Sequence, residues 1–204
     1  VSNGVTIIEN CAARGLSLKA GAVDGVVTEQ GTINCGRVVL AGGAWSSIFL
    51  RRHGVHIPQL SVRSTVGATN VLDEVFQGCA VDERIAFRRR KDGGFTLAPE
   101  GFHELFVGPD AFRALKHYLP QLIAHPFGTA FRPKAPKVYP DAWSTPRNWR
   151  LDQPSPFEKM RVLNPAPNKR VVKELAQNFA QTFPKLGQVE IETAWAGLID
   201  VLPD

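Results

Sequence analysis

The feature that most limits how this chain can fold is the run at residues 37–41, which is apolar after Arg37 and ends in Gly42-Gly43. A run without alternating polar residues is typical of a strand buried on both faces, as in a parallel sheet. Ligands of such sheets gather at the carboxyl ends of the strands, and glycine lets a backbone approach a ligand closely. The run therefore predicts an α/β arrangement with a ligand near Gly42-Gly43.

The other apolar segments and turns predict an α+β or α/β chain with a mixed, largely antiparallel sheet and flanking helices. The clearest signal is a hairpin of residues 84–90 and 95–98, because the intervening Asp-Gly-Gly tolerates the positive φ angles of tight turns. Further strands are predicted at residues 5–8, 12–18, 23–28, 32–35, 60–68 and 188–194. Helices are predicted at residues 45–53 with Ser46 as a cap, at 109–122, and from an Asn168 cap to Phe183.

Residues 125–168 contain nine of the 15 prolines of the chain, together with Trp143 and Trp149. Proline blocks sheet hydrogen bonding and helix interiors, so this segment is predicted to be an extended excursion rather than regular structure. Its aromatic side chains indicate that it packs onto something, as a lid or as a surface for an oligomer or a partner subunit.

The composition is that of an ordinary globular protein, with 44% hydrophobic and 21% charged residues. No apolar run is long enough for a transmembrane segment. The net charge of +5 suits an anionic cofactor or an acidic substrate, whereas the basic residues are too dispersed for a nucleic-acid binder. Three cysteines without a C-x-x-C pair argue against disulfides and zinc and favour the cytoplasm. The five histidines lack metal-ligand spacing, so no metal site is expected.

Two segments in this order are more specific than either alone: V-V-L-A-G-G-A-W-S at residues 38–46 and T-A-W-A-G-L-I-D-V-L-P-D at 193–204. The pair resembles the D-amino acid oxidase, glycine oxidase and sarcosine oxidase family of FAD enzymes. In that family the first segment leaves the FAD domain and the second returns toward the flavin. Residues 5–15 also resemble the family strand that lies against the adenine end of FAD.

The resemblance implies a partial FAD-binding domain at residues 1–48, a substrate-binding domain at 49–190 and a return strand at 191–204. It implies oxidation of the C–N bond of an amine or amino acid, by hydride transfer to FAD. The residues expected to bind the cofactor are Ala13, Ala41, Gly42, Gly43, Trp45 and Gly197. Those expected to bind the substrate are Arg88, Arg90, Trp195 and Ile199. No catalytic side chain is assigned, because a neutral amine requires no general base.

Two departures from the family pattern qualify this interpretation. The sequence has no G-x-G-x-x-G, the loop that holds the FAD pyrophosphate. The chain is therefore expected to be a piece of a longer flavoprotein, inactive by itself and binding FAD weakly or not at all. Relatives often keep an arginine for the substrate carboxylate where this chain has Ile199. A carboxylate would need Arg88, Arg89, Arg90 or Arg132, and an amine without a carboxylate is equally open.

The same residues have two further interpretations. Alternation along a strand places Arg88 and Arg90 on one face and Arg89 on the other, and this pattern fits a solvated strand edge as well as a substrate site. The whole chain also fits a non-catalytic binding or assembly domain of a larger complex, whose basic hairpin and proline-rich segment contact another subunit.

Overall fold

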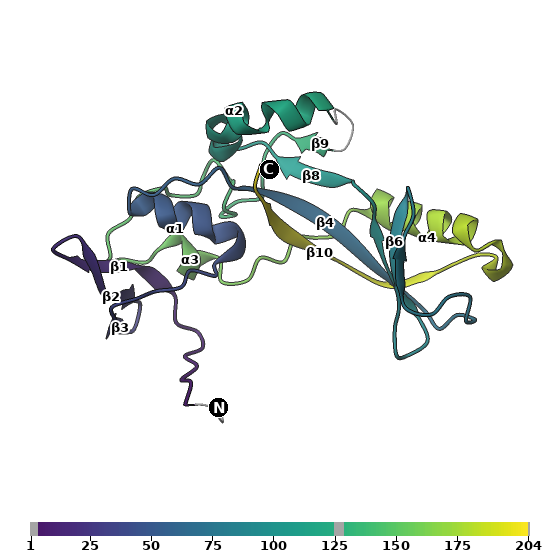
Figure 1. The fold of residues 1–204 in the computed structure, drawn as a ribbon, viewed down its shortest axis with the longest axis horizontal. Coiled ribbons are helices and arrows are strands. Elements are labelled where there is room, and N and C mark those ends of the chain that lie inside the picture. Colours follow the sequence, from purple (N-terminus) through teal and green to yellow (C-terminus); the bar gives the residue numbers. More distant parts are fainter. Residues whose placement is uncertain (1–3, 125–128, 204) are drawn as a thin grey trace.

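The computed structural model describes residues 4–124 and 129–203 and has two sheets of different size (Figure 1). The small sheet is an antiparallel meander of β1 (Ala13–Lys19), β2 (Ala22–Thr28) and β3 (Gly31–Asn34). These strands confirm the predictions at residues 12–18, 23–28 and 32–35. The strand predicted at residues 5–8 is wrong, because no described strand pairs with this segment. A long pair of strands runs from the middle of the molecule to the end opposite the small sheet, where the helix α4 (Lys169–Thr182) lies.

The predicted buried strand at residues 37–41 is wrong. The segment has no strand conformation, and the side chain of Val39 is 93% exposed. A strand buried on both faces needs hydrogen-bonded neighbours and a covering layer on each side, and no described residues supply them here. The apolar run therefore lies as an extended stretch that leads into the Gly42-Gly43 turn.

The large sheet is organised around β4 (Leu60–Thr69), which pairs antiparallel with β10 (Ile191–Val201) along its whole length. The other edge of β4 pairs with β7 (Phe95–Pro99) and then with β8 (His103–Phe106). The sheet continues through β6 (Ile85–Arg89) to β5 (Cys79–Val81) on one side and through β8 to β9 (Thr129–Arg132) on the other. Only the β8–β9 pair is parallel among the described strands, which confirms a mixed, largely antiparallel sheet.

The helices confirm the periodicities read from the sequence. They are α1 (Ser46–Arg52), α2 (Pro109–Ala124) and α4 (Lys169–Thr182). Asn168 caps α4 as predicted, since its side chain accepts a hydrogen bond from the Arg170 N–H. Ser46 is not a cap but the first residue of α1, because the short 3₁₀ helix η1 (Gly43–Trp45) runs directly into it. None of the described helices is long and apolar enough to cross a membrane.

The proline-rich segment is less irregular than expected, and it folds back on its own chain. It contains β9 and the one-turn helix α3 (Pro156–Lys159), while its first residues, His125 and Pro126, lie outside the described ranges. Trp149 Nε1 donates to the Arg14 carbonyl of the small sheet at 2.8 Å. The Arg14 guanidinium pairs with Glu158 of α3, Nε to Oε1, at 2.8 Å. The segment therefore attaches the small sheet to the rest of the structure through these hydrogen bonds.

The main hydrophobic core lies between α4 and one face of the large sheet. Phe179 of α4 and Phe95 of β7 are fully buried and their rings lie 4.9 Å apart, centroid to centroid. Leu175, one turn earlier on α4, and Leu97 of β7 complete the contact. α4 fills one part of this face and Ala135, Tyr139 and Ala142 fill another, so the opposite face of the sheet is the less covered one.

Candidate functional site

The face of the large sheet opposite α4 is apolar and only partly covered. Side chains alternate along β10, so Trp195, Gly197 and Ile199 share one face, while Ala196 and Leu198 point to the other. Trp195 and Ile199 are 42% and 43% exposed. On β4 their neighbours are Val66, Ser64 and Val62. We call Ser64, Val66, Trp195, Gly197 and Ile199 the open face.

Gly197 forms a hollow in the open face. A Cβ placed on it would have nothing within 4 Å, and its φ angle is not positive. The fold of the described residues therefore does not need glycine at this position. A missing side chain between two half-exposed apolar side chains is what a flat ligand needs for close approach to the backbone.

The buried side chain of Gln59 brings the Gly42-Gly43 turn next to β10. Its Nε2 donates to the Gly43 carbonyl at 3.0 Å and to Asp200 Oδ2 at 3.1 Å. Its Oε1 accepts from the Ser47 N–H at 2.8 Å. Gln59 is 5% exposed, so these bonds satisfy an amide that has little access to water. In the sequence, the one signal for this role is a polar residue placed directly before an apolar strand.

The predicted cofactor residues fall into two groups. Gly43 and Trp45 lie in η1, which Gln59 ties to the end of β10 that carries Gly197, and Ala41 and Gly42 lead directly into it. The Trp45 ring meets Phe157 edge-on, with centroids 5.3 Å apart. Ala13 is separate from these residues, because it belongs to β1 of the small sheet and pairs with Thr28 (Figure 1).

The predicted substrate arginines also separate. Arg88 is exposed and points away from α4, since its neighbour Phe87 is buried on the α4 side. Within the described chain, no hydrogen bond or ion pair involves the guanidinium of Arg88. Its strand, β6, lies three strand spacings from β10, about 14 Å, so Arg88 stands at the margin of the open face.

The expectation that Arg90 shares a face with Arg88 is wrong, because β6 ends at Arg89 and Arg90 turns into the hairpin. Its guanidinium binds Asp92 and donates to the carbonyls of Thr69 and Phe95 at 3.0 Å each. Arg89 donates to the Leu72 carbonyl and lies over the Phe95 ring. Both side chains hold the hairpin in place.

Arg132, the fourth cation considered for a carboxylate, is bound to a buried acid. Glu104 is 1% exposed and accepts from Arg63 Nε at 2.9 Å and Arg132 Nε at 2.8 Å. Burial by itself raises the pKa of Glu104, but the hydrogen bonds from the two arginines outweigh it and hold the pKa below its ordinary value. Glu104 is therefore an ionised anchor for the two guanidinium groups.

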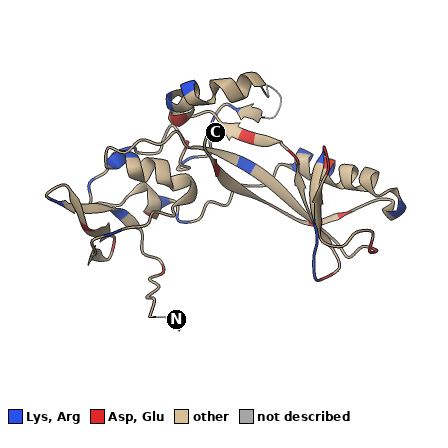
Figure 2. Cartoon of the chain, viewed as in Figure 1, with Lys and Arg blue, Asp and Glu red and all other residues tan. Residues whose placement is uncertain are grey.

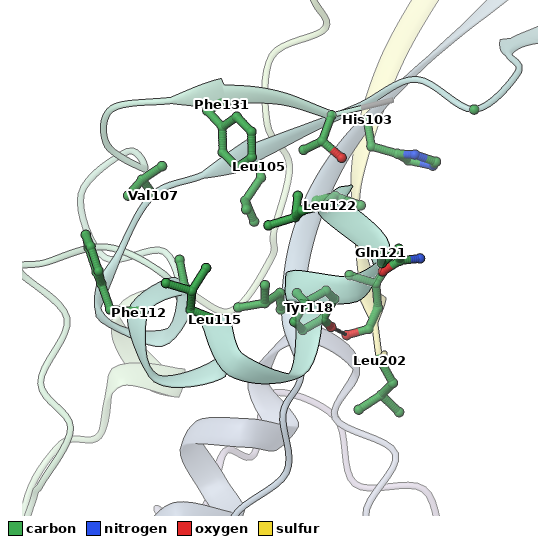
Figure 3. A pocket seen from close by; sticks show the side chains of 16 residues that line it. His103, Leu105, Val107, Phe112, Leu115, Tyr118, Gln121, Leu122, Phe131 and Leu202 are labelled. Carbon is green, nitrogen blue, oxygen red and sulfur yellow. Dashed lines mark hydrogen bonds between the residues drawn. The ribbon is translucent and has the colours of Figure 1, made fainter. Parts of the chain in front are cut away.

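A cavity of about 650 Å³ lies beside the open face, between α2 and the sheet (Figure 3). Leu60 and Val62 of β4 and Val201 of β10 form part of its wall. The Tyr118 hydroxyl of α2 donates to the Val201 carbonyl at 2.6 Å, which fixes the helix over the end of β10. Because Val62 pairs with Ile199, the cavity and the open face share a border.

Two buried acids lie close together, Asp110 in the first turn of α2 and Asp141 in the proline-rich segment. Asp110 Oδ1 accepts from Arg51 of α1 at 2.6 Å and from Arg113 at 2.8 Å. Asp141 is 5% exposed, and its Oδ2 has no hydrogen-bond partner among the described residues. Burial, and then the nearby charge of Asp110, raise the pKa of Asp141 to about 7.

Charged groups elsewhere are dispersed. Basic and acidic residues are spread over both ends of the molecule rather than gathered on one element (Figure 2). In residues 4–124 and 129–203, no group of three or more His, Cys, Asp or Glu side chains is placed to hold a metal ion.

Comparison with known proteins assigns this geometry to a family. Residues 1–204 match the family described as FAD dependent oxidoreductase. A glycine oxidase from Pseudomonas putida is 29% identical over an alignment of 149 residues, and the match covers 67% of this chain and 40% of the relative. The sarcosine oxidase subunit beta of an Arthrobacter species is 42% identical over 55 residues, 27% of this chain and 14% of the relative.

Solved structures give the same result. The L-amino acid deaminase from Proteus vulgaris superposes with a TM-score of 0.83 at 28% identity, covering 95% of this chain and 45% of that one. The enzyme from Proteus myxofaciens, in complex with anthranilate, gives 0.84 at 27% identity, covering 95% and 43%. The chain thus spans less than half the length of each of these relatives.

The raised pKa of Asp141 makes a prediction about stability. The unfolded chain loses this proton near 3.8 and the folded chain near 7, so Asp141 costs stability increasingly as the pH rises through that window. Asp141→Asn removes the cost. The free energy of unfolding of the variant, relative to the parent, should therefore rise by about 1.4 kcal/mol per pH unit across the window and then level off. Urea titrations at several pH values measure it, and a difference independent of pH would contradict it.

Proposed function

Because the chain belongs to the FAD dependent oxidoreductase family, we propose that the protein containing it uses FAD to oxidise the C–N bond of an amine or amino acid. In this proposal residues 1–48 and 191–204 belong to the part of the protein that binds FAD, and residues 49–190 belong to the part that binds the substrate. The observation that most supports this proposed function is the hollow at Gly197 in the open face.

The chemistry of the open face suits a flavin ring. The hollow is flanked by Trp195 and Ile199, both about two-fifths exposed, and no ionisable side chain is among the five residues of the open face. Gly43, held by Gln59 at the neighbouring strand end, adds a second stretch of backbone without a side chain. An apolar wall of this kind excludes water and orients the ring and the substrate.

The flavin, when bound, supplies the acceptor for a hydride from the carbon next to the nitrogen. The residues of this chain orient the substrate and the flavin. Trp195 and Ile199 confine the reacting carbon, and Gly197 permits the flavin ring to approach the backbone closely. None of the three can take up a proton, which agrees with a substrate that binds as the neutral amine. An amine oxidised in this way becomes an imine, which water hydrolyses.

For an amino acid we propose that Arg88 meets the carboxylate. It is the hairpin arginine whose guanidinium has no hydrogen bond or ion pair within the described residues, whereas Arg89, Arg90 and Arg132 are bound elsewhere. The names of the relatives support carboxylate substrates, since they include a glycine oxidase and L-amino acid deaminases, one of them solved with anthranilate.

We extend the proposal to a partner subunit and to the cellular location. The inner side of residues 129–168 contacts the small sheet, and their outer surface, with Trp143 60% exposed, is a site for a partner subunit. The similarity to a sarcosine oxidase subunit supports this. Three unpaired cysteines support a cytoplasmic location. A purely non-catalytic assembly domain is disfavoured by the family membership.

The first test is Gly197→Val in the intact protein that contains these residues. A Cβ at this position has nothing within 4 Å among the described residues, so the apoprotein should keep its melting temperature. FAD affinity should fall at least about tenfold, because the ring loses its close approach. Thr193→Val, an exposed position on the same face of β10, is the matched control. Unchanged FAD binding in Gly197→Val, measured by titration of the apoprotein, would contradict the proposal.

The second test is Arg88→Met. Loss of a charge-assisted hydrogen bond of about 1.5–3 kcal/mol should raise KM for amino acids roughly tenfold or more, with little change for amines that lack a carboxylate. Arg170→Met removes an exposed arginine that pairs only with Glu174 on α4 and should alter neither. The measurement is KM from steady-state kinetics, for an amino acid and for the matching amine without a carboxylate. Equal small effects on both substrates would show that Arg88 is a surface charge and does not bind the carboxylate.

A further inference from the structure

The cavity under α2 is built mainly from apolar side chains. Figure 3 shows Phe112 and Leu115 of α2 on one side and Leu105 and Phe131 of the strands on the other. No Asp, Glu, Lys or Arg is among the lining residues that belong to the described part of the chain. A lining of this kind binds apolar groups and rejects charged ones, because a charge buried there would lose its hydration without gaining a partner.

The few polar side chains lie at one end of the cavity. His103 and Gln121 are together at the end opposite Phe112 and Val107 (Figure 3). Glu104 pairs with Arg63 in the sheet, so His103, one residue earlier, lies beside Ser64 of the open face. The polar end of the cavity therefore adjoins the open face, and the apolar end lies farthest from it.

The volume of the cavity sets the size of its occupant. An apolar cavity of about 150 Å³ is enough to hold benzene, and this one has about 650 Å³. A substituent as small as a hydrogen or a methyl group would leave it unfilled. An aromatic ring or a long aliphatic chain would exchange water for the contacts that Leu105, Leu115 and Phe131 offer.

We propose that this cavity receives the side chain of the substrate, and that the substrate is an amine or amino acid with a large apolar substituent. The assignment rests on the proposed function, since it takes the open face as the place of reaction. The nitrogen end stays at the open face, past His103, and the apolar group extends under α2 toward Phe112. The shared border through Val62 and Ile199 is what connects the two.

Two leucines on α2 provide a matched pair for the test. Leu115 lines the cavity and Leu119, one turn later, is not among its lining residues, yet they are 48% and 49% exposed. Leu115→Trp narrows the cavity without disturbing a buried position, and Leu119→Trp makes the same change outside it. Leu202→Trp, at a second lining position that is 53% exposed, guards against a local effect of α2.

The measurement is kcat/KM of the intact, FAD-loaded protein for phenylalanine against alanine and for phenethylamine against ethylamine. Whichever of the two pairs the unmodified protein oxidises, its kcat/KM should be higher for the larger substrate of that pair. Leu115→Trp and Leu202→Trp should lower that preference about tenfold or more, with the small substrate little changed and Leu119→Trp like the parent. Calorimetry with 3-phenylpropionate, which has no nitrogen to oxidise, should show weaker binding in the same two variants.

The outcomes separate the two proposals. An unchanged preference and unchanged 3-phenylpropionate binding in both cavity variants would overturn the side-chain assignment alone. Equal effects of Leu115→Trp and Leu119→Trp would also overturn it, because the outer surface of α2, available to a second copy of the chain, would then be what matters. Absence of flavin reduction by every amine and amino acid would overturn the proposed function, and this assignment with it.

Discussion

The buried amide of Gln59 holds together two parts of the chain that are far apart in sequence. Its hydrogen bonds reach the Gly43 carbonyl, the Ser47 N–H and the carboxylate of Asp200, which is 141 residues away. An apolar side chain of the same size would leave the buried Ser47 N–H without a partner, at about 1–3 kcal/mol, and would release the Gly43 carbonyl and Asp200 from each other. The Gly42-Gly43 turn and the hollow at Gly197 become one site because this amide fixes the turn at the end of β10.

The two faces of the large sheet then divide the remaining tasks. One face is filled by α4, with Phe179 and Leu175 packed on Phe95 and Leu97, and it supplies stability. The other face keeps Trp195 and Ile199 half exposed and ends in the cavity under α2. A single alternating strand, β10, contributes to both faces, so the same eleven-residue segment (Ile191–Val201) supports the core and forms the candidate site.

Local signals were sufficient where the structure is local. The Asp92-Gly93-Gly94 turn predicted the hairpin of β6 and β7, and the Asn168 cap with its apolar period predicted α4. Pairings between distant segments were not readable: the parallel contact of β8 with β9 depends on α2 lying between them in sequence. The run at residues 37–41 misled because an apolar pattern says what a segment could bury, and not whether another strand is there to pair with it.

The same limit applied to the site. The motif around Trp195 located the open face, because strand alternation alone places Trp195, Gly197 and Ile199 together. Alternation failed for Arg90, which the nearby Asp92 and two carbonyls draw into the hairpin beyond the end of β6. Gln59 and the cavity under α2 depend on tertiary contacts, for which the sequence carries no spacing or motif.

The most direct measurement is a crystal structure of the intact protein with FAD bound. We expect the flavin ring against the open face, with atoms within about 4 Å of Gly197, between Trp195 and Ile199 and next to Gly43. A ring bound elsewhere, with Gly197 facing solvent or covered by protein, would contradict this placement of the cofactor.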